Sequence, residues 1–146
     1  LGLLSVNGLA TAHEVIIPLQ PHFLALQGLG KLLQTVTAVR QTANPALRVS
    51  GILLTMYETG TRLAAEVRRD IADFLAAADP ADAWHGARLF DTVIRRNIKL
   101  AECPSFGQTI FDYAATSNGA EDYLALSREV LAMSAPAAAP ADAEVA

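Results

Sequence analysis

The chain has 146 residues, enough for one domain with an ordinary hydrophobic core. Apolar residues make up 52% of it and charged residues 18%, which excludes a chain that is disordered over most of its length, and the net charge of −4 argues against a generally basic coat for nucleic acid. The single cysteine, Cys103, excludes an internal disulfide and a multi-cysteine metal site, and it indicates a reducing compartment, the cytoplasm.

The first half of the chain alternates between helical and strand patterns. A short apolar segment that ends near Ala12 predicts a helix, and residues 15–18 predict a buried strand that a proline closes. Residues 23–43 carry apolar side chains at helical spacing, with glutamines available for the wet side, and an Asn-Pro pair follows them. The run VSGILLT, residues 49–55, predicts a second buried strand.

The second half continues the alternation with shorter elements. An amphipathic helix is expected from Leu63 to about Ala78, and the composition of residues 78–86 predicts a loop. Residues 89–94 predict a third strand. Beyond a turn rich in proline, serine and glycine, residues 109–113 predict a short fourth strand.

The last predicted element is a helix that begins at Asn118. Glu121 follows three residues later, as in a capping box. Its expected apolar face consists of Ala120, Tyr123, Leu124, Ser127, Val130 and Leu131. Residues 134–146 are rich in alanine and proline and are expected to form a flexible tail. No uninterrupted apolar run approaches the roughly 18 residues of a membrane span.

Strands that alternate with helices predict right-handed crossovers and an α/β fold, with a mostly parallel sheet between two layers of helices. The continuous apolar run at residues 49–55 suits a strand that is covered on both faces. Ligands of such sheets bind beyond the carboxyl ends of the strands. This rule directs attention to the loops after Pro18, Thr55 and Ile94.

Basic residues are unevenly distributed. Seven of the eleven lie between Arg62 and Lys99, which permits a local anionic partner without requiring one. Three histidines, His13, His22 and His85, are too scattered for a recognisable metal spacing, so no metal site is expected. No phosphate-binding glycine-rich loop occurs anywhere in the sequence.

Three segments, in this order, resemble the ParA family of partition ATPases, the deviant Walker P-loop group that also includes Soj-like and MinD-like proteins. They are LGLLSVNGLATAHEVIIPLQPHFLALQGLGKLL, NPALRVSGILLTMYETGTRLAAEV and VIRRNIKLAECPSFGQTIFDYAATSNGAEDYLAL. The resemblance implies that residues 1–133 form the C-terminal portion of the ATPase domain, after its nucleotide-hydrolysing motifs. It assigns no catalytic residue to this chain, which alone is expected neither to hydrolyse ATP nor to bind it tightly.

The resemblance also implies a function for the whole protein. Family members are dimers that use ATP and Mg²⁺, bind DNA non-specifically in the ATP-bound state, and respond to a ParB-like centromere-binding partner. They move chromosomes or plasmids apart in the cytoplasm, in association with the nucleoid. The acidic, proline-rich tail differs from the basic membrane helix of MinD-like proteins, so no membrane partner is expected. The alternative is a non-catalytic interaction or assembly module.

Two residues correspond to positions that border adenine in the family. The residue at Arg95 contributes backbone and the residue at Asn97 its side chain, which offers a donor and an acceptor to a base edge. Arg95 departs from the family's usual proline, so the resemblance carries over a backbone contact and not its shape. Asn97 has an equal alternative role, as a loop residue that caps local backbone.

Three basic residues are candidates for contact with DNA phosphates. Lys99 corresponds to a basic position that the family needs for DNA binding, and Arg96 is its neighbour. A second basic position of the family falls at Gly60, and Arg62 either replaces it or pairs with Glu66 on a helix surface. The loop at residues 78–86, an insertion relative to shorter members, either packs over the domain or touches a partner.

Overall fold

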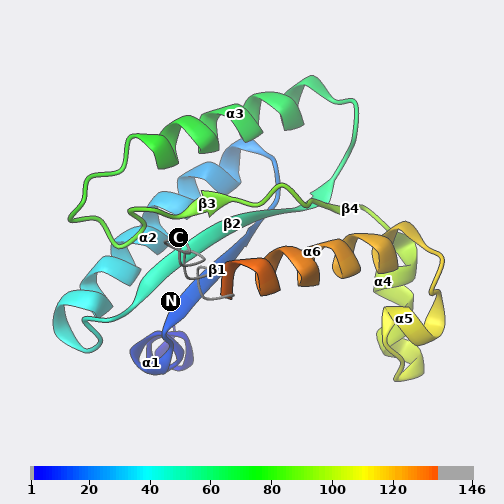
Figure 1. The fold of residues 1–146 in the computed structure, drawn as a ribbon, viewed down its shortest axis with the longest axis horizontal. Coiled ribbons are helices and arrows are strands. Elements are labelled where there is room, and N and C mark those ends of the chain that lie inside the picture. Colours follow the sequence, from blue (N-terminus) through cyan, green and yellow to red (C-terminus); the bar gives the residue numbers. More distant parts are fainter. Residues whose placement is uncertain (1, 135–146) are drawn as a thin grey trace, which may run out of the picture.

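The structure is a computed structural model that describes residues 2–134, without the side chains of residues 23–25 and 134. The predicted flexible tail lies outside the described residues, apart from Ser134. Four parallel strands form the sheet, and β2 pairs with each of the other three (Figure 1). The strands are β1 (Glu14–Leu19), β2 (Arg48–Tyr57), β3 (Arg88–Leu89) and β4 (Ile94–Arg95).

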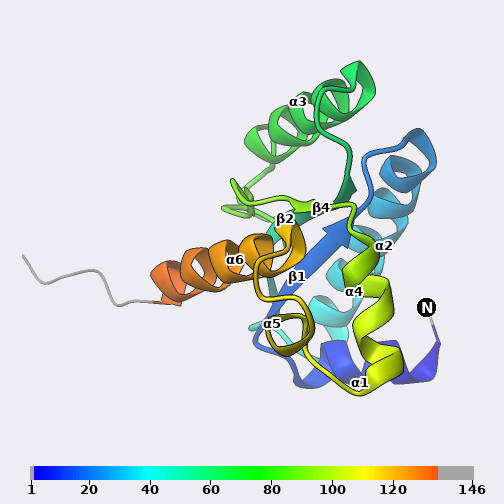
Figure 2. The same ribbon diagram turned by 90° about the vertical axis from the view of Figure 1, so that its right-hand side faces the viewer.

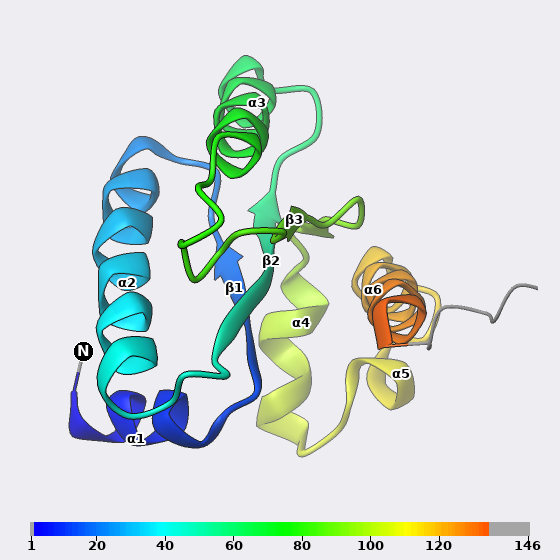
Figure 3. The same ribbon diagram turned by 60° about the vertical axis from the view of Figure 1, so that its left-hand side comes forward.

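Helices lie on both sides of this sheet, so the expected three-layer α/β fold is confirmed. Figure 3 shows α2 and α3 on one side of the strands and α4, α5 and α6 on the other. The helices are α1 (Leu3–Thr11), α2 (Phe23–Thr42), α3 (Arg62–Ala76), α4 (Ile98–Glu102), α5 (Ile110–Tyr113) and α6 (Asn118–Ser134), with a 3₁₀ turn, η1 (Cys103–Phe106), after α4.

The larger core lies between β1, β2 and the helices α2 and α3. Four α2 side chains at helical spacing are buried against the sheet: Leu29, Leu33, Val36 and Val39. α3 contributes Val67, Ile71 and Leu75, while Phe74 of the same helix is 41% exposed and stacks on Trp84 at 5.9 Å between ring centroids. The loop at residues 78–86 therefore packs over the domain through its tryptophan.

The predicted strand at residues 89–94 is divided into two short strands by its hydrogen bonds to α6. Phe90 is fully buried, and its N–H still donates to Ile52 O at 3.0 Å. The N–H groups of Asp91 and Thr92 instead donate to the carboxylate of Glu129, at 2.9 and 3.0 Å. Because these donors turn to α6, the ladder with β2 is interrupted and resumes at β4.

The predicted strand at residues 109–113 was wrong, since this segment forms the helix α5. Thr109 caps it, because its Oγ1 accepts from the N–H of Asp112 at 3.3 Å and donates to the Asp112 carboxylate at 2.6 Å. The preceding turn is more regular than predicted, since it contains α4 and η1. Gly107 ends η1 in the left-handed conformation, at φ 62°.

The last helix begins where it was expected, but Ser117 rather than Asn118 accepts the capping bond, from Ala120 N–H at 3.3 Å. Its buried face is rotated from the predicted one. Ala120 is buried and Val130 partly buried as expected, whereas Leu131 is 70% exposed. Gly119, Asp122, Leu126 and Met133 take the inward positions that the prediction gave to Tyr123, Leu124 and Leu131.

Two glycines should respond in opposite ways to alanine. Gly28 lies on an exposed part of α2 where an added Cβ meets nothing within 4 Å, so Gly28→Ala should raise the free energy of unfolding by about 1 kcal/mol. In β2, a Cβ on Gly51 would lie 2.6 Å from Arg88 O, so Gly51→Ala should lower it by about 1–3 kcal/mol. Urea denaturation measures both, and equal shifts would contradict the packing at Gly51.

The edge of β1 gives a second prediction. Among the described residues β1 pairs with β2 alone, and Ile16 is 39% exposed beside a groove that Val130 and Met133 line. An apolar strand edge recruits other strands, so the 146-residue polypeptide should self-associate, and Ile16→Lys should shift it toward monomer in light scattering. Ile98→Lys, which changes an exposed isoleucine away from the edge, is the control. A monodisperse wild-type monomer would refute the prediction.

Candidate functional site

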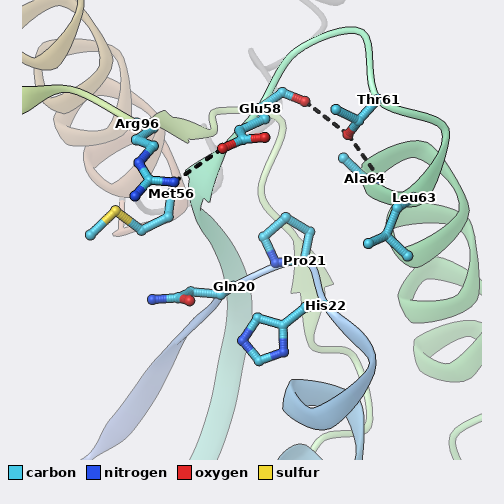
Figure 4. Close-up of a pocket in the computed structure, with 9 residues that line it drawn as sticks. All are labelled: Gln20, Pro21, His22, Met56, Glu58, Thr61, Leu63, Ala64 and Arg96. Carbon is cyan, nitrogen blue, oxygen red and sulfur yellow. Dashed lines mark hydrogen bonds and ion pairs between the residues drawn. The ribbon is translucent and has the colours of Figure 1, made fainter.

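The loops after β1, β2 and β4 meet at the carboxyl ends of the strands, as the strand-end rule predicted. They line a pocket of about 350 Å³, here called the strand-end pocket (Figure 4). Its lining residues are Gln20, Pro21, His22, Met56, Glu58, Thr61, Leu63, Ala64 and Arg96. A second pocket of about 240 Å³, here called the β4 pocket, shares Gln20 and Met56 with it. Its other lining residues are Thr55, Ile94, Arg95, Asn97, Leu100, Ala101 and Tyr123.

Met56, which lies on the rim of both pockets, has a strained backbone. Its φ is 51°, in the left-handed region that an L-residue with a side chain seldom adopts. The register of β2 against β4 shifts at this point, between Thr55 and Tyr57. Strain of this kind persists only where surrounding contacts impose it, and it is often found at binding sites. The sequence carries no signal for it.

The N-terminus of α3 closes one side of the strand-end pocket. Thr61 caps the helix, because its Oγ1 accepts from Ala64 N–H at 3.3 Å while its hydroxyl donates to Glu58 O at 3.1 Å (Figure 4). The Glu58 side chain extends the other way and accepts from Arg96 Nη1 at 3.2 Å. Glu58 therefore joins the β2 loop both to α3 and to the segment that follows β4.

Arg95 directs its side chain toward α6. Its backbone N–H donates to Asp122 Oδ2 at 2.8 Å, and its guanidinium donates to Asp122 Oδ1 from Nη2 at 2.7 Å and from Nε at 3.0 Å. Nη2 also donates to Glu121 Oε2 at 3.2 Å. The hydrogen bonds to Asp122 raise the pKa of the Arg95 side chain above its ordinary value. Arg95 also lines the β4 pocket.

Sequence reasoning missed Asp122, which the prediction omitted from the inward face of α6. The residue is 8% exposed. One signal was available, since Asp122 is spaced three and four residues from Gly119 and Leu126, so these positions share one face of a helix. A charged residue within a stripe of inward positions needs a partner, and the nearby bases of the sequence include Arg95.

Asn97 caps α4, so the alternative role predicted for it is confirmed. Its Oδ1 accepts from Lys99 N–H at 2.8 Å. The residue also lines the β4 pocket. Because the cap occupies the side-chain oxygen, the Nδ2 amide is the group best placed to meet a ligand there, as a donor. The contact with a base stays a prediction.

The three candidate DNA-contact residues surround this end of the sheet, and two of them hold carboxylates. Arg96 pairs with Glu58, and Lys99 Nζ donates to Glu102 Oε2 at 2.8 Å, a bond that lowers the pKa of Glu102. Arg62 is the exposed first residue of α3, directly after the capping threonine. The ion pairs recorded for the described residues do not include the alternative pair of Arg62 with Glu66.

Two further features of the described residues concern ligands and membranes. Histidine, cysteine and acidic side chains form no group of three that is able to hold a metal ion within residues 2–134. In the same part of the chain, no helix is both long and apolar enough to cross a bilayer.

Comparison with known proteins gives consistent relatives. A family model described as an AAA domain matches residues 1–49. The chain is 46% identical over 132 residues to the chromosome-partitioning ATPase Soj of Treponema pallidum, covering 90% of this chain and 48% of that protein. It is 40% identical over 136 residues to the chromosome partitioning protein ParA of Myxococcus xanthus, covering 93% and 44%. The chain thus spans about half the length of the curated relatives it matches.

A solved structure extends the comparison to the fold. Cobyrinic acid a,c-diamide synthase from Mycobacterium smegmatis, with bound ADP and magnesium, superposes with a TM-score of 0.64 at 30% identity. The match covers 89% of this chain and 42% of that one. The same enzyme with an ATP analogue and magnesium gives a TM-score of 0.62. The α/β architecture is therefore shared with an enzyme solved with bound nucleotide.

The Glu129 carboxylate that anchors the loop between β3 and β4 should make stability depend on pH. Partial burial acts to raise its pKa, but hydrogen bonds from Thr92 and Asp91 and the charge of Arg88 outweigh burial, so the pKa lies below its ordinary value of 4.5. A carboxyl group with a lowered pKa in the folded state stabilises the fold at pH values above its unfolded-state pKa. This stabilisation is lost as the pH falls through the folded-state pKa of Glu129.

Glu129→Gln should therefore lower the free energy of unfolding at pH 7 by about 1–2 kcal/mol. The difference in the free energy of unfolding between the variant and wild type should shrink as the pH falls from about 5 toward 3. Protonation of Glu129 then removes the same charge from the wild-type protein. Urea denaturation across this range measures it. A difference that stays constant with pH would refute the role of the charge.

Proposed function

Because the chain belongs to the ParA/Soj family of chromosome-partitioning ATPases, we propose that it forms the C-terminal portion of such an ATPase and supplies its base pocket and part of its DNA-binding surface. The observation that carries this proposal is the meeting of three strand-end loops beside exposed basic residues (Figure 2 shows β4 running into α4 at this end). The chain spans about half of its relatives, so the activity is proposed for the whole protein.

The β4 pocket fits the base of an adenine nucleotide. Ile94, Leu100, Ala101 and Tyr123 offer apolar surface to a flat ring, while Asn97 offers its Nδ2 donor to an edge. The backbone at Arg95 forms the rim. The bound nucleotide would supply the phosphate anhydride whose hydrolysis drives the cycle. This chain contains no glycine-rich phosphate loop, so the chain alone should neither hydrolyse ATP nor hold ATP and Mg²⁺ tightly.

The basic residues beside this pocket would contact DNA phosphates. Arg62 begins α3, Lys99 lies in α4, and Arg96 lies in the loop between β4 and α4. Exposed basic side chains of this kind supply charge to phosphates and do not by themselves read bases. Such contact gives binding that depends on salt and is independent of sequence. We propose that the ATP-bound protein is a homodimer that binds DNA in this way in the cytoplasm, associated with the nucleoid, and that a ParB-like protein stimulates its hydrolysis.

The DNA-binding test uses Lys99→Ala in the protein that carries this chain, at its natural length. Loss of one phosphate contact should weaken binding to all DNA sequences alike and reduce the slope of log K against log salt by about 1. Fluorescence anisotropy with two unrelated duplexes, with and without ATP, measures this. Lys31→Ala, which removes an exposed lysine from α2, is the matched control and should leave binding unchanged.

Each arm has a contradicting result. If Lys99→Ala binds both duplexes as wild type does, Lys99 does not contact DNA. If wild type binds DNA equally with and without ATP, the proposed ATP-dependent dimer is wrong, and a non-catalytic interaction module becomes the better interpretation. A sequence-dependent loss would show that Lys99 reads bases, which the proposal excludes.

A further inference from the structure

Asp122 is a buried carboxylate whose recorded hydrogen bonds all go to one residue. Its exposed fraction is 8%, and no other charged side chain of the described residues is buried to this extent. Its oxygens accept from the backbone N–H of Arg95 at 2.8 Å and from the guanidinium at 2.7 to 3.1 Å. A buried carboxylate is costly unless it is paired and hydrogen-bonded, and Arg95 meets both needs.

Arg95 also needs Asp122, because an arginine at position 95 brings hydrogen-bond donors that a proline lacks. A proline at this position would have neither a backbone N–H nor a charge. Arg95 adds an N–H at the end of a two-residue strand, next to a pocket, together with a guanidinium. Asp122 satisfies both groups at once. The two residues therefore form a matched pair.

This pair joins two walls of the β4 pocket. Arg95 lines the pocket from β4, and Tyr123, next to Asp122 in sequence, lines it from α6. Two turns further along α6, Glu129 accepts from the N–H groups of Asp91 and Thr92. β3 and β4 each pair with β2 through only two residues. The bonds to Glu129 therefore add support between these strands, and the bonds to Asp122 add support at β4 itself.

We propose that Asp122 is a positioning residue of the base pocket: it fixes the backbone of Arg95 relative to Tyr123, and thereby sets which base the pocket accepts. The inference rests on the proposed function of the β4 pocket. Asp122 itself does not line the pocket, so its effect on a ligand is transmitted through Arg95. A one-ångström shift of the rim is enough to change a hydrogen-bonded base contact.

The experiment compares ADP and GDP binding by calorimetry in the natural-length protein. Asp122→Leu should weaken ADP binding roughly tenfold and narrow the preference for ADP over GDP, because two sets of donors lose their acceptor. Glu121→Gln is the matched control. It removes a carboxylate of the same helix that bonds only the guanidinium, so the preference should persist.

A rescue variant separates positioning from general damage. Arg95→Pro alone leaves Asp122 buried without its partner and should weaken ADP binding about as much as Asp122→Leu. The double variant Arg95→Pro/Asp122→Leu removes both sets of polar groups and should return ADP binding to within about threefold of wild type. If the double variant is as weak as either single variant, the inference is overturned.

Hydrogen exchange distinguishes this inference from the proposed function. In wild type the Arg95 amide should be protected, and Asp122→Leu should speed its exchange at least tenfold while Glu121→Gln leaves it unchanged. Unchanged exchange in Asp122→Leu overturns the anchoring. A wild type that binds neither nucleotide, with the Arg95 amide still protected by Asp122, overturns the base pocket and leaves only the structural pair.

Discussion

Every other strand of the sheet depends on close approach to β2. That approach requires a glycine at position 51, where a Cβ would meet Arg88 O at 2.6 Å and the Phe90 ring at 2.8 Å. Because Gly51 lacks a side chain, Phe90 can lie over β2 fully buried. The strands before and after Phe90 in sequence, β3 and β4, both pair with β2. The strand-end pocket and the β4 pocket form because the loops after β1, β2 and β4 leave the sheet at the same edge.

The helix α6 supplies hydrogen-bond acceptors for backbone N–H groups next to the sheet. The segment between β3 and β4 has backbone donors that face away from β2, and Glu129 accepts from two of them. Asp122 accepts from the N–H of Arg95, in β4 at the pocket rim. Asp122 and Glu129, seven residues apart on one face of α6, thus accept hydrogen bonds from three backbone N–H groups. The helix that packs on the sheet also determines the path of the loop that borders the β4 pocket.

The sequence predicts the long elements well because their patterns are long. α2 and α3 carry apolar residues at helical spacing, and β2 carries a continuous apolar run, so the layered α/β fold and the strand-end location of the site follow from them. The segment 109–113 is too short for a period, and its helix depends on a local cap at Thr109. Asp122 bonds a residue 27 positions away, so its helical spacing marks an inward position without identifying its partner. The φ of Met56 depends on its neighbours in space and has no signal along the chain. The base and DNA contacts rest on family resemblance and stay predictions.

The basic rim has a consequence for how it would compete for an anion. Arg96 and Lys99 already hold Glu58 and Glu102, so an incoming phosphate displaces a tethered carboxylate rather than bulk water alone. Exposed pairs of this kind are weak, so under the proposed DNA contact the tethered carboxylate would be a weak competitor that stays close to its base. A single phosphate would gain little from displacing it, whereas a polyanion would gain from several exchanges at once. Under that proposal, the ion pairs would favour multivalent ligands over single anions.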